Sequence, residues 1–319
     1  MIPPPRVLPR GPVAPGPVRA GASALSTTIA CSLPVFLVGG LAVQISDELR
    51  FSPAGLGVAV SVYFGVSALA SVPAGRVVER YGSTAVARGA VLLASACLLA
   101  IAVAARSLVG LVTLLALGAA ANALGQLASN SVLARNVPTR RQGLSFGVKQ
   151  AAIPVSTLLA GAAVPVVALT LGWRWAFVLA AVGAAAAWTV VPVEDPSARP
   201  STDRGATRAT GALVVLGAAA TLAAGAANAL STFLVDASVA RGVAPGAAGL
   251  ALTLGGAVCV LARIAGGWQA DRRPGSQVGV MRCCWRWARA DSRCSRLPAP
   301  RRSSRAWCSA SAWAGPGPD

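Results

Sequence analysis

Long apolar segments alternate with short polar ones over most of the chain. Eight of these segments reach about 20 residues, the length that an α-helix needs to cross the hydrocarbon core of a bilayer. They span residues 24–45, 53–74, 84–105, 108–133, 144–169, 173–192, 211–235 and 246–267. The first is too long for the core of a cleaved signal peptide. The pattern therefore predicts an all-α polytopic membrane protein.

One polar break between apolar segments recurs along the chain. The residues from Gly75 to Gly82 have a related copy that starts at Gly267, 192 residues later. At this offset the aligned pairs are Pro53 with Pro245, Gly57 with Gly249, Gly75 with Gly267, Glu79 with Asp271 and Arg80 with Arg272. A repeated helix with its exit segment indicates two similar halves, an organisation typical of membrane transporters.

Composition supports membrane residence and excludes several other classes. Hydrophobic residues make up 55% of the chain and charged residues 12%, whereas soluble proteins carry about 25% charged residues. The net charge of +18 comes from arginines in the connections and at the C-terminal end. The sequence shows no basic helix face, so we do not expect nucleic-acid binding. The chain has no histidine, and its seven cysteines lack metal-site spacing, so we expect no metal, no cofactor and no disulfide framework.

The arginines in the connections predict the orientation in the membrane. With the N-terminus in the cytoplasm, each cytoplasmic connection holds at least two arginines and each opposite connection holds one. The cytoplasmic arginines are Arg76, Arg80 and Arg88; Arg135, Arg140 and Arg141; Arg199, Arg204 and Arg208; and Arg272 and Arg273. The opposite ones are Arg50, Arg106, Arg174 and Arg241. The positive-inside rule therefore predicts a multi-pass protein of the cell (inner) membrane with a cytoplasmic N-terminus.

The same pattern divides the chain into five parts. We expect a disordered cytoplasmic tail (1–20), a six-helix bundle (21–192), a cytoplasmic linker (193–210), a partial second bundle of two helices (211–280) and a non-spanning tail (281–319). The last part holds eight arginines, four tryptophans and four cysteines, where the repeat predicts a ninth span. Our hypothesis is that the reading frame changes near Val280; the alternative is a genuine basic tail.

The break at 75–82 resembles the signature of the major facilitator superfamily, Gly-x-x-x-Asp-Arg-x-Gly between helices 2 and 3, with a weaker copy between helices 8 and 9. Further similarity lies in Gly172–Phe177, which looks like the start of a family helix 6, and in Gly147–Pro165, which looks like helix 5. The resemblance implies a major-facilitator-like fold with a complete N-terminal six-helix bundle and about two helices of the second bundle. Glu79 stands where the family usually has aspartate.

The break itself predicts a gating latch. Gly75 permits close helix approach, and Gly82 can adopt a positive φ and turn the chain sharply. Glu79 can accept hydrogen bonds from a helix N-terminus, while Arg76 and Arg80 stay near the anionic inner leaflet. The second copy contributes Gly267, Asp271 and Arg272. The resemblance implies that the acid acts against helices of the second half, particularly the eleventh; the alternative is a basic turn that only sets topology.

Polar side chains inside the predicted spans are candidates for a substrate cavity. Asn122, Gln126 and Asn130 recur every four residues and so share a helix face, where either a cavity lining or helix–helix hydrogen bonding would satisfy them. Lys149, the only lysine, and Gln150 follow in the fifth span, and Asn228 lies in the seventh. A buried lysine would attract an organic anion, although Lys149 could also extend to the membrane interface.

These features favour a secondary transporter that moves a small solute by alternating access. The alternative is a truncated, transport-inactive membrane fragment of such a transporter. An enzyme is not expected, because the chain offers no histidine, no paired intramembrane carboxylates and no nucleophile–base arrangement. The expected partners are a small-molecule solute, with Lys149 favouring an organic anion, and the lipid bilayer.

Overall fold

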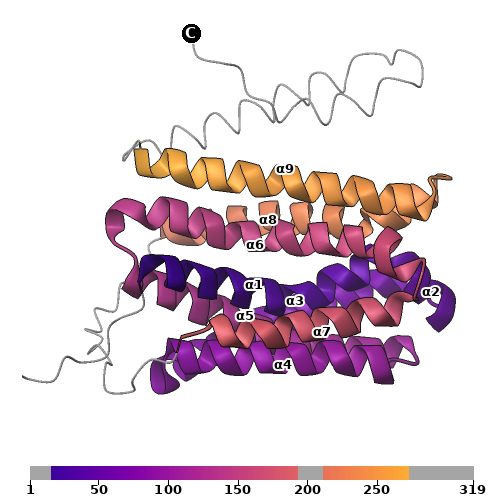
Figure 1. Cartoon of the computed structure of the whole chain (residues 1–319), viewed down its shortest axis with the longest axis horizontal. Coiled ribbons are helices and arrows are strands. Elements are labelled where there is room, and N and C mark those ends of the chain that lie inside the picture. The colour runs from indigo at the N-terminus through magenta and orange to yellow at the C-terminus, as the bar shows by residue number, and fades with distance from the viewer. Residues whose placement is uncertain (1–15, 193–210, 273–319) are drawn as a thin grey trace, which may run out of the picture.

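A bundle of long helices forms the protein, as a computed structural model shows (Figure 1). The structure describes residues 16–192 and 211–272. Within these residues, eight helices are long and apolar enough to cross a membrane, which confirms the predicted all-α polytopic architecture. The linker at 193–210 and the tail at 281–319, with its hypothetical change of frame, lie outside the described residues, as do residues 1–15.

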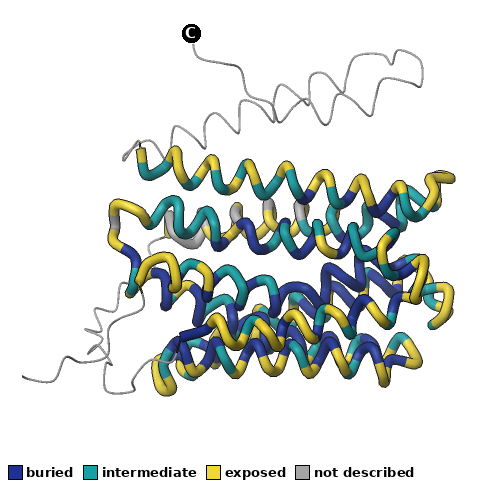
Figure 2. The backbone as a smooth tube through the Cα atoms, in the orientation of Figure 1, coloured by how far each residue is buried: buried dark blue, intermediate teal, exposed yellow. Residues whose placement is uncertain are grey.

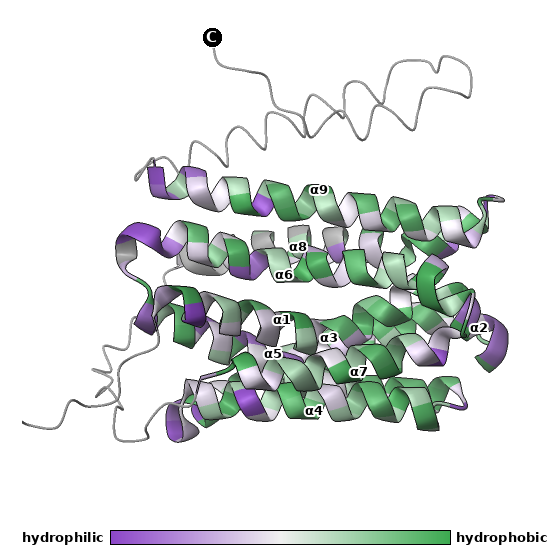
Figure 3. Ribbon diagram, viewed as in Figure 1, coloured by the Kyte–Doolittle hydropathy of each residue, from purple (hydrophilic) through white to green (hydrophobic). Residues whose placement is uncertain are grey.

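Eight of the helices follow the predicted order of spans, and a short additional helix, Ala42–Leu49, begins inside the segment 24–45 that we expected to be a single span. The helices are α1 (Pro17–Gly40), α2 (Ala42–Leu49), α3 (Pro53–Tyr81), α4 (Ser83–Ala104), α5 (Leu108–Asn136), α6 (Gln142–Ala163), α7 (Trp173–Val190), α8 (Gly211–Val239) and α9 (Pro245–Arg272). A short 3₁₀ turn, Thr139–Arg141, precedes α6, and a π-helical turn, Val164–Ala168, follows it. Hydrophobic residues cover the helix bodies, and polar residues gather at their ends and on α2 (Figure 3).

Three expected boundaries differ from the structure, namely the start of α1 and the ends of α3 and α9. Helix α1 begins at Pro17, inside the segment 1–20 that we expected to be disordered, because proline is well suited to the first turn of a helix. Helices α3 and α9 continue through the predicted breaks, so Gly75–Tyr81 and Gly267–Arg272 are their last turns rather than loops. Both helices also begin at the aligned prolines, Pro53 and Pro245. The repeat therefore corresponds to two whole helices of matching extent.

Helix α1 is the most buried spanning helix and contacts α5, α6, α7 and α8 (Figure 2). Hydroxyl groups join it to its neighbours: Thr28 Oγ1 donates to Ser129 Oγ on α5 (3.4 Å), and Ser32 and Ser156 on α6 share a hydrogen bond of 2.9 Å. The Tyr63 hydroxyl on α3 donates to the Cys31 carbonyl (2.9 Å). Such small hydroxyl residues allow close packing and satisfy polar groups inside a membrane.

Helices α6 and α9 make the most extensive contact between the two halves, along a glycine seam in which the backbones touch. A Cβ atom built on Gly161 would lie 2.6 Å from the carbonyl oxygen of Gly249, and one built on Gly267 would lie 2.6 Å from that of Gly143. The seam consists of Gly143, Gly147 and Gly161 on α6 and Gly249, Gly256 and Gly267 on α9. Small residues permit this approach where hydrophobic burial cannot drive association.

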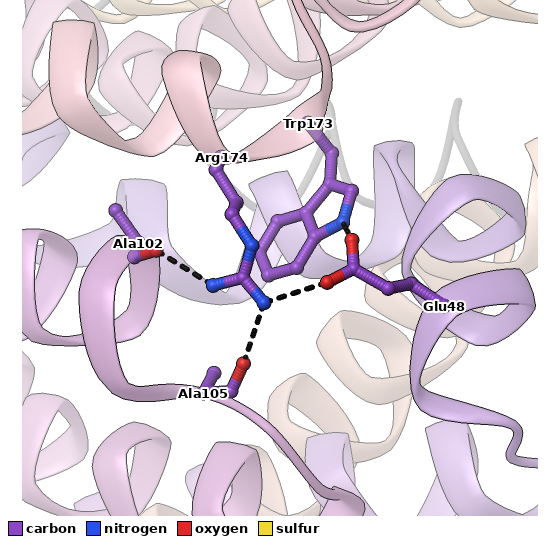
Figure 4. A network of polar contacts seen from close by, with 5 residues as sticks. All are labelled: Glu48, Ala102, Ala105, Trp173 and Arg174. Atoms are coloured by element: carbon purple, nitrogen blue, oxygen red, sulfur yellow. Dashed lines mark hydrogen bonds and ion pairs between the residues drawn. The ribbon is translucent and has the colours of Figure 1, made fainter.

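An ion-pair network fixes the start of α7 against α2 and the end of α4 (Figure 4). The Arg174 guanidinium donates to Glu48 Oε1 (2.7 Å) and to the carbonyls of Ala102 (2.7 Å) and Ala105 (2.9 Å). Trp173 Nε1 donates to the other Glu48 oxygen (2.6 Å). A cation near the C-terminal carbonyls of a helix is favourable because those carbonyls have no partner within the helix.

The opposite ends of α4 and α7 are joined in a related way. Arg88 on α4 donates through Nε to the carbonyl of Val191 just after α7 (3.2 Å), and its guanidinium lies 4.5 Å from the Trp188 ring centroid. Each helix of this pair therefore supplies an arginine to the C-terminal end of the other. This exchange holds α4 and α7 together at both ends.

The Glu48 network predicts a pH-dependent contribution to stability. The hydrogen bond from Arg174, and to a smaller extent the one from Trp173, lowers the pKa of Glu48 below its usual range. Because the pKa of Glu48 is lower in the folded state than in the unfolded state, its ionised carboxylate stabilises the fold at any pH above the unfolded-state pKa. This contribution is lost as the pH falls through the folded-state pKa. We expect Glu48→Gln to lower the free energy of unfolding by less than about 1 kcal/mol at neutral pH, because the Arg174–Glu48 ion pair is partly exposed.

Unfolding in detergent, followed from about pH 7 to about pH 3.5, checks this expectation. The difference between wild type and Glu48→Gln should shrink as the pH falls. Glu79→Gln is the matched control, because Glu79 is exposed and makes no hydrogen bond or ion pair with the described residues. A difference that stays constant or widens at low pH would contradict the assigned role of Glu48.

Candidate functional site

A polar cavity lies between α5 and α6. It has a volume of about 550 Å³, and its lining comprises Gln126, Asn130, Ser131, Ala134, Phe146, Lys149 and Gln150. Four of the six cavity candidates from the sequence, Gln126, Asn130, Lys149 and Gln150, therefore come together here. We call this space the Lys149 cavity.

Lys149 is the central polar group of this cavity. Its residue is only 3% exposed, and its Nζ donates to Gln126 Oε1 (2.5 Å). Helix α6 begins at Gln142, so Lys149 lies seven residues, about two turns, into the helix. An ammonium group has three donors, and among the described residues only Gln126 accepts from it. The side chain is therefore directed into the bundle, and two of its donors are not used by the described residues.

Asn122 and Asn228 lie elsewhere. Asn122 Nδ2 donates to Ser67 Oγ on α3 (3.0 Å), and its buried Oδ1 accepts no hydrogen bond from the described residues. Side chains four residues apart on a helix differ in direction by about 40°, so Asn122 faces α3 while Gln126 faces α6. Asn228 lines a separate cavity between α6, α8 and α9. For Asn122, helix–helix hydrogen bonding describes the observed contact.

Asp271, near the end of α9, binds the start of α6. Its Oδ1 accepts from the Gly143 backbone N–H and its Oδ2 from the Leu144 N–H, both at 2.8 Å. The first N–H groups of a helix have no partner within it and carry a partial positive charge, so a carboxylate is favourable there. The neighbouring Arg272 lies over the Trp268 ring, 3.8 Å from its centroid. Asp271 therefore joins the two halves at one end of the glycine seam.

The first copy of the repeat makes fewer contacts. Gly82 has the expected positive φ, +88°, at the turn into α4. Gly75 has open space where a Cβ atom would lie, so the close approach expected there is found at its counterpart Gly267 instead. Arg76, Glu79 and Arg80 are exposed, and Arg80 lies over the ring of the adjacent tyrosine. A latch formed by Glu79 remains a prediction.

One candidate was overlooked in the sequence. Arg263 interrupts the apolar segment 246–267 and lines the same cavity as Asn228. An arginine inside a spanning helix is a recognised sign of a functional site, so the charge pattern of the segment could have identified it. Within the described residues, no group of three metal-binding side chains is close enough to hold an ion.

Comparison with known proteins identifies the family. The sequence model of the Major Facilitator Superfamily matches residues 24–284, more than half of the chain. No curated protein sequence matched the chain. The eight membrane-length helices and the polar cavity between α5 and α6 are compatible with this family of membrane transporters. The chain belongs to the major facilitator superfamily of membrane transporters.

Proposed function

We propose that the protein is a secondary transporter that moves a small organic anion by alternating access between its two halves. The observation that carries the proposal is the buried ammonium of Lys149 in a polar cavity of a transporter-family bundle. Ionisable groups inside membrane bundles are costly and generally belong to substrate or ion pathways. The burial of this charged group therefore favours a role in the pathway of a small solute.

The lining of the Lys149 cavity favours a carboxylate. Lys149 supplies the positive charge, and the amide groups of Gln126, Asn130 and Gln150 can donate further hydrogen bonds. Charge-assisted hydrogen bonds are stronger than neutral ones, particularly away from water. A solute carboxylate could therefore accept from Lys149 while the amides determine its orientation.

The Asp271 contact is suited to control access to this cavity. The contact lies at the start of α6, and Lys149 lies about two turns further along the same helix. We propose that separation of α9 from α6 at this end breaks the two hydrogen bonds and frees the start of α6 to move against α5, which changes access to the Lys149 cavity. Gly267 permits the closed arrangement, and Gly75, Arg76, Glu79, Arg80 and Gly82 form the equivalent latch of the first half.

We further propose that this end faces the cytoplasm of a cell with an inner membrane. The support is the distribution of arginine over the connections, which favours a cytoplasmic N-terminus. In this orientation the Lys149 cavity lies on the cytoplasmic side.

Lys149→Gln should lower carboxylate transport strongly. A hydrogen bond to a charged group contributes about 1.5–3 kcal/mol, which corresponds to a loss of about 10- to 100-fold in apparent affinity. The measurement is uptake into proteoliposomes of radiolabelled mono- and dicarboxylates, with their neutral amides as comparison substrates. Lys149→Arg should retain part of the activity. Arg19→Gln, which removes an exposed arginine outside the cavity, is the control.

Absence of carboxylate uptake by the wild-type protein, or equal uptake by wild type and Lys149→Gln, would refute the assigned role of Lys149. Preferential uptake of the amides would refute the choice of an anionic solute.

Asp271→Asn should weaken the contact between the halves. The amide oxygen can still accept one backbone hydrogen bond, but the charge and the second acceptor are lost, so we expect a destabilisation of about 1–2 kcal/mol. Thermal unfolding in detergent measures the change. Asp236→Asn is the matched control, because the Asp236 side chain makes no hydrogen bond or ion pair with the described residues. Equal unfolding temperatures for Asp271→Asn and wild type would show that the contact contributes nothing.

A further inference from the structure

Arg263 places a positive charge inside the apolar body of α9. The helix is 28 residues long, and Arg263 precedes its last residue, Arg272, by nine positions, or about 13 Å along the axis. The residues around it, from Val258 to Ala265, are otherwise apolar or small. Within the expected span 246–267 it lies four residues from the end, where an arginine is unfavourable in a bilayer unless it reaches the interface, a partner or a polar cavity.

No described residue supplies that partner. Arg263 makes no hydrogen bond and no ion pair with the described residues, where the single ion pair is that of Arg174 with Glu48. The nearest acid along its own helix, Asp271, is engaged by the start of α6. Arg263 is exposed rather than buried among the described residues. Its five N–H donors are therefore available to a bound anion.

Arg263 lines a cavity of about 570 Å³ between α6, α8 and α9, helices that Figure 1 shows at one edge of the bundle. Asn228 and Ser231 of α8 and Thr157 of α6 add polar groups to the lining, and the Asn228 side-chain amide has no hydrogen-bond partner among the described residues. Most of the remaining lining is apolar and includes Leu230, Leu234, Leu252, Leu254 and Val258. A cavity with one cation, one free amide, two hydroxyl residues and otherwise largely apolar walls matches an amphipathic anion.

We infer that the Arg263 cavity binds an organic monocarboxylate with an apolar body. The planar guanidinium can donate two parallel hydrogen bonds to the carboxylate, and the Asn228 amide can donate a third. The leucine and valine side chains would contact the hydrocarbon part. This site is distinct from the Lys149 cavity, because Lys149 lies against Gln126 of α5, whereas Ile153, Pro154 and Thr157 of α6 line the Arg263 cavity.

Binding to the purified full chain tests the inference without reference to transport. The probes are benzoate and hexanoate, with benzamide and hexanamide as uncharged counterparts, measured by calorimetry in detergent. The experiment uses both wild type and the Lys149→Gln chain, so that a contribution of the Lys149 cavity is separated. We expect both carboxylates, and neither amide, to bind the Lys149→Gln chain.

Substitutions at the cavity identify the binding groups. Each substitution is added to the Lys149→Gln chain. Arg263→Gln should raise the dissociation constant of the carboxylates at least about 10-fold, and Asn228→Ala should raise it about 3-fold or more. Arg263→Lys should give a dissociation constant between that of the Lys149→Gln chain and that of the Arg263→Gln variant. Arg241→Gln, which removes an exposed arginine outside the cavity, should leave binding unchanged. Retained ligand-free unfolding temperatures show that each variant is folded.

Three results would overturn the inference. The first is failure of both carboxylates to bind the Lys149→Gln chain, and the second is equal binding by that chain with and without Arg263. The third is stabilisation through Arg263 by dihexanoyl-phosphatidylglycerol but not by the carboxylates, since the anion would then be a lipid headgroup. Each result leaves the transport test at Lys149 standing, because that test depends on the other cavity.

Discussion

The contact of α6 with α9 along the glycine seam is the constraint on which the rest of the structure depends. Two apolar helices gain little from hydrophobic burial when lipid already surrounds them, so close backbone packing must supply the attraction. At Gly161, Gly256 and Gly267 a single added Cβ atom would fall within 3.0 Å of the opposite helix. The two halves of the described chain therefore meet through main-chain atoms, which leaves little tolerance for larger side chains.

The position of α6 gives the two cavities their separate character. One side of the helix carries Lys149 toward Gln126 of α5, and another carries Pro154 and Thr157 toward α8 and α9. The seam runs between these regions, and Asp271 closes it at the start of α6. A movement of α9 relative to α6 would therefore change the Arg263 cavity directly and the access to the Lys149 cavity indirectly. This arrangement would couple the two cavities in the alternating access that we propose.

The sequence predicted most of the fold because a bilayer imposes long apolar helices that length alone reveals. It also indicated the positive φ of Gly82 and named Gln126 and Lys149 among the cavity candidates, although nothing in the sequence pairs these two side chains. It did not reveal that the repeat segments stay helical to Tyr81 and Arg272, because polar residues at a membrane interface are compatible with either helix or loop. The Glu48–Arg174 pair joins residues 126 positions apart, and no local pattern indicates such a contact.

The most direct test of the seam compares two adjacent glycines of α9. A Cβ atom at Gly256 would lie 2.9 Å from the Leu158 nitrogen and the Pro154 oxygen, whereas one at Gly255 would meet open space. Unfolding in detergent should show Gly256→Ala destabilised by about 1–3 kcal/mol through overpacking. Gly255→Ala should be neutral or more stable, since alanine favours helix over glycine. Equal stability of the two variants would contradict a main-chain contact between the halves.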